Sequence, residues 1–172
     1  IMTTGIWVLG DQLWTEQAAL SSCEGEKQNC PVIFIESRDH ARKKRYHAQK
    51  LVLVWSAMRH FAEELRALGW QVTYEIADNF ETPLLNWIKQ QGITELRVMM
   101  PNDRPFTQFI QSLSLNCSLK LLPNNHFLWT TNEFSQWGES RKRLLLENFY
   151  RESRKRFKIL MEGKQPLGGT WN

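Results

Sequence analysis

The chain has 172 residues, a formal net charge of +4 and 42% hydrophobic residues. This length and composition fit one globular domain that buries a sizeable core. No apolar stretch reaches the roughly 18 residues that span a bilayer. The N-terminus also lacks a basic segment followed by an apolar signal core. The sequence therefore predicts a cytoplasmic protein with no membrane partner.

The first 123 residues alternate between apolar, β-branched runs and amphipathic stretches. Strands are predicted at residues 6–9, 32–36, 70–76, 94–100 and 119–123. Helices are predicted at residues 51–68, at 82–91 with Thr82 as N-cap, and at 103–115. Strands separated by helices imply right-handed crossovers and a parallel sheet. We expect an α/β fold with an open parallel sheet of about five strands, flanked by helices.

The pattern changes after Pro123. A short helix is expected near residues 133–137, followed by a basic helical stretch that ends around Gly163, and residues 165–172 are predicted to form no element. We therefore divide the chain into an α/β domain at residues 1–130 and a helical connector with the start of a linker at residues 131–172.

Positive charge is concentrated in two segments. Residues 141–164 hold nine Lys or Arg and three Asp or Glu, and "RKKRYHAQK" covers residues 42–50. Clusters of this kind contact phosphate groups or form solvated helix faces. The sequence leaves both interpretations open.

The first two predicted strands end in residues that suit a ligand site. Gly10, Asp11 and Gln12 follow the first strand, and Glu36 ends the second. In an open parallel sheet, ligands bind outside the carboxyl ends of the strands. Gly10 would allow close backbone approach to a ring, the three polar side chains would hydrogen-bond its edges or hydroxyls, and Val54 would pack on its face. A turn capped by Asp11 and Gln12, with no ligand, explains the same residues equally well.

The usual catalytic and cofactor motifs are missing. The chain has no GxGxxG after the first strand, no GxxxxGK[ST], no HExxH, no CxxC and no GxSxG. We predict no catalytic residue and no metal ligand, and we interpret Cys23, Cys30 and Cys117 as ordinary thiols. From the residues alone, this is a small-molecule-binding α/β domain without evident chemistry.

Three stretches together resemble one family. They are "LGDQL" at residues 9–13, "RYHAQKLVLVWSAMRHFAEELRALGW" at residues 45–70 and "ENFYRESRKRFKILMEGKQPLGGTWN" at residues 147–172. They are similar to the deoxyribodipyrimidine photolyase-related proteins, the bacterial photolyases and cryptochromes that carry an iron–sulfur cluster. The resemblance covers essentially the whole chain, and the C-terminal run is its most specific part.

The resemblance implies a Rossmann-like antenna domain. In the family, this N-terminal domain holds a light-harvesting chromophore, typically 6,7-dimethyl-8-ribityllumazine. A following helical domain, absent from this chain, binds FAD, a four-iron four-sulfur cluster and damaged DNA. The whole protein then performs light-driven repair of (6-4) photoproducts or blue-light signalling. By resemblance, Gly10, Asp11, Gln12, Glu36 and Val54 bind the antenna. The loop at residues 37–46 is expected to add contacts because it follows the second strand, but its first half does not match the family residue by residue, so the identity of the antenna stays open.

Further expectations follow from the same resemblance. The partners are the chain's own helical domain and, through the full-length protein, damaged DNA. The fragment is expected to be monomeric, and its three cysteines are not cluster ligands. Two other functions stay open, namely a nucleic-acid-binding module acting through residues 141–158 and a structural docking domain with an empty crevice.

Overall fold

The structure, a computed structural model, describes residues 2–171. The chain divides into two compact units, residues 1–128 and residues 129–172, and each is described by itself. None of the helices in residues 2–171 combines the length and the hydropathy that crossing a bilayer requires.

The first unit is built on one parallel sheet. Its strands are β1 (Thr4–Trp7), β2 (Val32–Ser37), β3 (Val72–Ala77), β4 (Glu95–Met99) and β5 (Ser118–Leu122). The order across the sheet is β3-β2-β1-β4-β5, and every neighbouring pair is parallel. The predicted open parallel sheet of five strands is therefore confirmed. The chain first builds outward from β1 to β3 and then returns to place β4 on the other side of β1.

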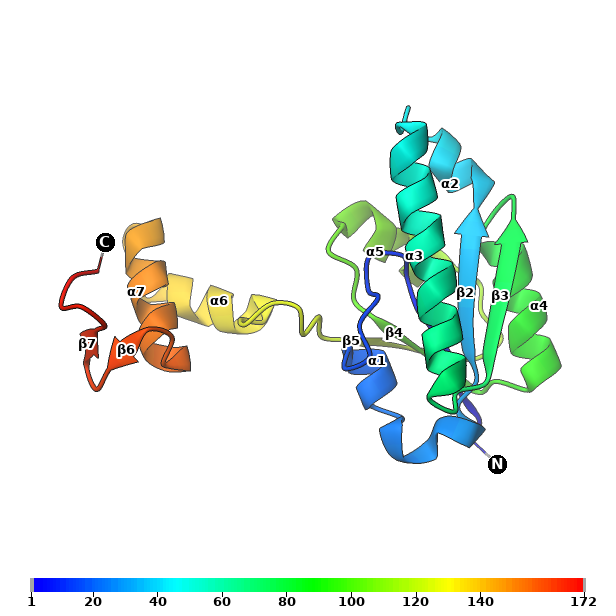
Figure 1. The fold of residues 1–172 in the computed structure, drawn as a ribbon, viewed down its shortest axis with the longest axis horizontal. Coiled ribbons are helices and arrows are strands. Elements are labelled where there is room, and N and C mark those ends of the chain that lie inside the picture. The colour runs from blue at the N-terminus through cyan, green and yellow to red at the C-terminus, as the bar shows by residue number, and fades with distance from the viewer. Residues whose placement is uncertain (1, 172) are drawn as a thin grey trace. The chain divides into compact units, whose positions relative to one another are not determined.

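Helices cover both faces of this sheet, as a Rossmann-like fold requires. The helical segments of the unit are α1 (Ala18–Ser21), the 3₁₀ segment η1 (Glu24–Asn29), α2 (Arg38–Arg42), α3 (Ala48–Ala67), α4 (Glu81–Gln91) and α5 (Arg104–Ser112). Figure 1 shows α3 crossing one face of the sheet and α4 lying behind the other.

Alternating side chains of the two central strands fill the core on both faces. Ile6 and Val8 pack with Met58 of α3 on one face, whereas Trp7 packs with Trp87 of α4 on the other. Successive side chains of a strand point to opposite faces, so an unbroken apolar run is what a doubly covered strand needs. This explains why residues 6–9 and 32–35 carry no polar side chain.

Several predicted boundaries differ from the structure. Thr82 is not the N-cap of α4, because the helix already begins at Glu81 and Asn79 Oδ1 accepts the Thr82 N–H at 2.8 Å. The helix predicted at residues 103–115 stops at Ser112, where Leu113 takes an extended conformation. Asp103 lies just outside this helix as its N-cap and accepts the N–H of Phe106.

The second unit is small and mostly helical. It contains α6 (Thr131–Glu139), α7 (Leu146–Phe157) and a two-stranded antiparallel hairpin of β6 (Met161–Glu162) and β7 (Gln165–Pro166). The prediction that residues 165–172 form no element was wrong, because Gln165 and Pro166 pair with β6. The basic helix is also shorter than predicted, since Lys158 adopts a left-handed conformation (φ 54°) that ends α7.

Aromatic rings hold the second unit together. Phe149 of α7 lies 5.1 Å from Trp129, 5.2 Å from Phe134 and 5.0 Å from Trp137, measured between ring centroids. Aromatic pairs at these separations add to the hydrophobic effect of burial. These rings therefore form an aromatic cluster within the unit, and each ring stays partly exposed.

The tight packing around Gly5 of β1 gives a test of the core. A Cβ atom at Gly5 would lie 2.7 Å from the ring of Trp87 and 2.9 Å from Ile93 Cδ1, and both side chains are buried. We expect Gly5→Ala to lower the free energy of unfolding by about 1–3 kcal/mol, the usual cost of overpacking. Urea denaturation followed by far-UV circular dichroism measures this change. Gly25→Ala is the control, because nothing lies within 4 Å of its Cβ position, and an equal effect of the two substitutions would contradict the packing argument.

Candidate functional site

The carboxyl edge of the sheet holds a cavity of about 600 Å³. Gly10 and Asp11 line it beyond β1, Ser37 at the end of β2, and Pro101 and Asp103 beyond β4. The strand order reverses between β1 and β4, which is where ligands bind in open α/β sheets. The volume falls in the range of about 300–1,000 Å³ that is usual for small-molecule sites.

Aromatic rings form one wall of the cavity. Phe80 lies 5.5 Å from Trp7 and 5.4 Å from Phe106, and Phe106 lies 5.5 Å from Phe109, between ring centroids. All four rings line the cavity. The wall joins residues of β1, of the segment before α4 and of α5, and it offers flat apolar surface to a ligand.

Helix α3 forms the opposite wall. Leu51, Val54, Trp55 and Met58 line the cavity at helical spacing. Gly10 lies close to this wall, since a Cβ atom there would be 3.0 Å from Met58 Sδ and 3.6 Å from Val54 Cγ1. The absence of a side chain at Gly10 thus keeps the space between β1 and α3 open.

Polar side chains form the smaller part of the lining, namely Asp11, Ser37, His40, Lys43, Lys44, Tyr46, Lys50 and Asp103. The hydroxyl of Ser37 donates to Asp78 O (2.9 Å) and accepts the N–H of His40 (3.1 Å), so it is already engaged. The carboxylate of Asp103 caps α5. Asp11 is exposed, and its side chain has no hydrogen-bond partner within residues 2–171. A mainly apolar cavity with a few polar groups suits a flat heterocycle.

Three of the five predicted site residues come together. Gly10, Asp11 and Val54 line the cavity, whereas Gln12 and Glu36 are not among its lining residues. Gln12 is 1% exposed and donates from Nε2 to Met99 O at 2.8 Å. Its side chain therefore ties the end of β1 to the end of β4.

Glu36 is held in a buried network beside the cavity. Its carboxylate accepts hydrogen bonds from Arg59 Nε (2.8 Å), Arg59 Nη2 (3.0 Å) and the hydroxyl of Tyr74. Glu36 is 2% exposed, so these partners replace the water that an ionised carboxylate needs. Burial, together with the Glu36 carboxylate, raises the pKa of Tyr74 above its ordinary value. The network anchors α3 to β2 and β3.

His40 lies at the rim of the cavity between two rings. Its centroid is 5.4 Å from that of Phe80 and 5.4 Å from that of Phe106. Burial lowers the pKa of His40 below its ordinary value of 6.5. Lys43 and Lys44 lower this pKa further, and Asp103 opposes them.

The sequence analysis missed the aromatic wall and, among the basic residues that line the cavity, Lys50. Phe106 and Phe109 lie three residues apart on α5, a spacing that places both on one face of a helix. Trp7 and Trp55 also line the cavity, and the sequence analysis did not place them at the site. Part of the expected loop at residues 37–46 does line it, through Ser37, His40, Ala41, Lys43, Lys44 and Tyr46.

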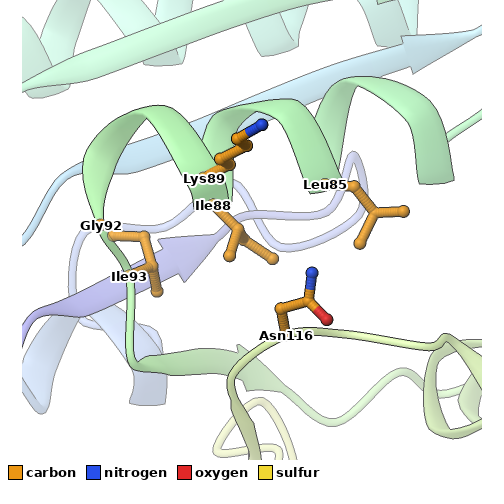
Figure 2. A pocket seen from close by; sticks show the side chains of 6 residues that line it. All are labelled: Leu85, Ile88, Lys89, Gly92, Ile93 and Asn116. Carbon is orange, nitrogen blue, oxygen red and sulfur yellow. The ribbon is translucent and has the colours of Figure 1, made fainter.

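A second, smaller cavity of about 250 Å³ lies at the opposite, amino edge of the sheet. Figure 2 shows its lining residues, with Leu85, Ile88 and Lys89 from α4 and Asn116 facing them from the segment before β5. It has no aromatic wall and no converging set of polar groups. Within residues 2–171, no three His, Cys, Asp or Glu side chains come together as a metal site.

The fold and the cavity define a Rossmann-like α/β domain with a ligand-sized space at the switch point of its sheet. The chain belongs to the deoxyribodipyrimidine photo-lyase-related protein family, whose model matches residues 6–172.

The chain is also similar in sequence to two individual proteins. It is 32% identical over 179 residues to a (6-4) photolyase of Agrobacterium fabrum, an alignment that covers 99% of this chain and 35% of the photolyase. It is also 26% identical over 141 residues to an uncharacterized protein of Acanthamoeba polyphaga mimivirus, covering 78% of this chain and 72% of that protein. The chain thus spans about a third of the length of the photolyase that it matches.

The buried network around Glu36 predicts that removing one of its hydrogen bonds lowers the free energy of unfolding. Tyr74→Phe removes one hydrogen bond to a buried carboxylate, and such bonds contribute about 1.5–3 kcal/mol. Since Tyr74 is only half-buried, we expect a loss near the lower end, about 1–2 kcal/mol, in urea denaturation. Tyr46→Phe is the matched control, because the Tyr46 hydroxyl makes no hydrogen bond within residues 2–171. A loss as large in the control would argue against the network.

The lowered pKa of His40 predicts how the stability of the protein depends on pH. Because the folded state binds the proton more weakly than the unfolded state, the contribution of neutral His40 to stability is complete above pH 6.5. It is lost as the pH falls from 6.5 through the lower folded-state pKa. We expect His40→Gln to remove this part of the pH dependence of the melting temperature. His60→Gln, an exposed substitution on α3, should leave it, and identical profiles for the two variants would contradict the assignment.

Proposed function

We propose that this chain is the antenna domain of a photolyase-related protein and that the cavity at the carboxyl edge binds a flat heterocyclic chromophore. One observation carries the proposal, namely the cavity of about 600 Å³ between the aromatic wall and α3. Membership of the photolyase-related family supports a light-absorbing chromophore as the ligand. The candidate chromophore is 6,7-dimethyl-8-ribityllumazine.

The residues of the cavity fit such a ring. A lumazine ring would lie between the aromatic wall on one side and Val54 and Met58 on the other. Both sides offer apolar surface. Gly10 lets the ring approach the backbone. Asp11 is placed to accept a hydrogen bond from a ring N–H or from a ribityl hydroxyl. When bound, the chromophore would supply light absorption, and the chain's own residues would only hold and orient it.

The missing catalytic signature agrees with this role. An antenna passes excitation to a second chromophore, so no bond is made or broken and no general acid or base is needed. In the same proposal, a further part of the full-length protein binds FAD and an iron–sulfur cluster. The full-length protein would then repair (6-4) photoproducts, as the name of the Agrobacterium relative suggests, or act in blue-light signalling.

The contacts of the basic helix favour the antenna over a nucleic-acid-binding module. Arg151 pairs with Glu147 at 2.7 Å, and Arg156 pairs with Glu133. Arg154 is 8% exposed and donates to the carbonyl of Ile159 and to that of Leu160. These three arginines therefore already interact with groups of their own unit. Fewer positive charges of the basic helix are then available to contact the phosphates of a nucleic acid.

A fluorescence titration with 6,7-dimethyl-8-ribityllumazine tests the proposal. We expect saturable binding to the wild-type chain and binding weakened by about tenfold in Asp11→Ala, which removes one hydrogen bond to a charged group. Val54→Asp, which places a charge against the ring face, should abolish binding.

The control is Glu64→Ala, which removes an exposed carboxylate from α3 away from the cavity. Circular dichroism verifies that each variant is folded. If the wild-type chain does not bind, or if Glu64→Ala weakens binding as much as Asp11→Ala does, the cavity is not the antenna site.

A further inference from the structure

Three lysines line the cavity without an ion-pair partner. Lys43 and Lys44 follow α2, and Lys50 lies in the first turn of α3; all three are exposed and line the cavity. None of them forms a salt bridge within residues 2–171. Lys50 Nζ lies 4.8 Å from the centroid of Tyr46, and Lys43 Nζ lies 5.9 Å from that of Phe109. The ammonium groups of Lys43 and Lys50 thus lie over rings that also line the cavity.

Most nearby arginines behave differently. Three of them are paired with carboxylates, namely Arg38 with Asp78, Arg42 with Asp39 and Arg59 with Glu36. Arg45, like the three lysines, forms no salt bridge within residues 2–171. Two carboxylates, those of Asp11 and Asp103, also line the cavity. Asp103 is engaged as the cap of α5, so Asp11 is the one free carboxylate among the described lining residues.

The N-terminus of α3 adds to the positive potential at this rim. The helix has 20 residues, and its first-turn residues Lys50 and Leu51 line the cavity. Its early N–H groups are largely used, because His47 Nδ1 accepts from Gln49 and the His47 carbonyl accepts from Lys50 and Leu51. An anion at this rim would therefore contact the lysine ammonium groups more than the helix backbone.

We propose that the cavity takes a ring ligand whose side chain ends in a phosphate, with the ring against the aromatic wall and the phosphate among Lys43, Lys44 and Lys50. This inference rests on the proposed antenna site, and it replaces the unphosphorylated lumazine with a phosphorylated ring chromophore as the ligand of that site. The lumazine carries a ribityl chain without a phosphate, so it would use the ring half of the cavity and leave the lysines unmatched. A phosphorylated ring ligand would use both halves.

Riboflavin and FMN form a matched pair of probes, because they share a ring and a ribityl chain and differ by one phosphate. We expect FMN to bind the wild-type chain at least about tenfold more tightly than riboflavin, as charge-assisted contacts to a phosphate imply. This advantage should shrink as salt is added. The variant Lys43→Gln, Lys44→Gln, Lys50→Gln should reduce the affinity for FMN to that for riboflavin and leave riboflavin binding unchanged.

Lys89→Gln is the control, because it removes an exposed positive charge that lies at the other cavity. Inorganic phosphate serves as a competitor that measures the affinity of the lysines for phosphate without a ring. Equal affinities for FMN and riboflavin, or an FMN advantage that survives in the triple variant, would overturn the inference. If the lumazine binds in that case, the antenna proposal stands and only the phosphate assignment fails. If neither the flavins nor the lumazine bind, both proposals fail.

Discussion

A parallel sheet covered by helices on both faces leaves only its strand ends available for a ligand. Ile6 and Val32, side by side in β1 and β2, are completely buried, and so are their neighbours on the opposite face. No polar group can be placed along these strands without a buried partner. The change from apolar to polar residues at Gly10 therefore marks the point where the chain leaves the core. The cavity lies at that point because the strand order reverses there.

The wall of the cavity depends on contacts outside it. Glu36 does not line the cavity, but its pairing with Arg59 connects β2 to the helix that carries Val54 and Met58. An ion pair with one buried partner contributes little net stability by itself, yet it restricts the position of the helix. The residue thus acts on the shape of the cavity through α3, and a change at Glu36 would affect ligand binding without removing a ligand contact.

The cavity has an apolar part and a charged rim, and each of the two suits a different part of one ligand. The tilted and edge-to-face rings of the aromatic wall favour a flat heterocycle by burial of its area. Ammonium groups at an exposed rim favour an anion and make its affinity depend on salt. A site of this composition suits the binding and orientation of one ligand. That division agrees with a light-harvesting role within the photolyase-related family.

The sequence by itself determined the fold class, three of the five predicted site residues that line the cavity, and the loop at residues 37–46 that supplies further lining residues. The run at residues 6–9, the run at residues 32–36 and the helical spacing of Val54 and Met58 depend on local periodicity, which a sequence displays directly. Gly10 and Asp11 were found because a strand end is visible in the sequence. Only the tertiary structure decided that Glu36 turns to Arg59 and Tyr74, and that Phe80, Phe106 and the lysines meet at one cavity. The partners are 23 positions apart for Glu36 and Arg59, 38 for Glu36 and Tyr74 and 26 for Phe80 and Phe106. They are selected by packing in three dimensions, which no local pattern records.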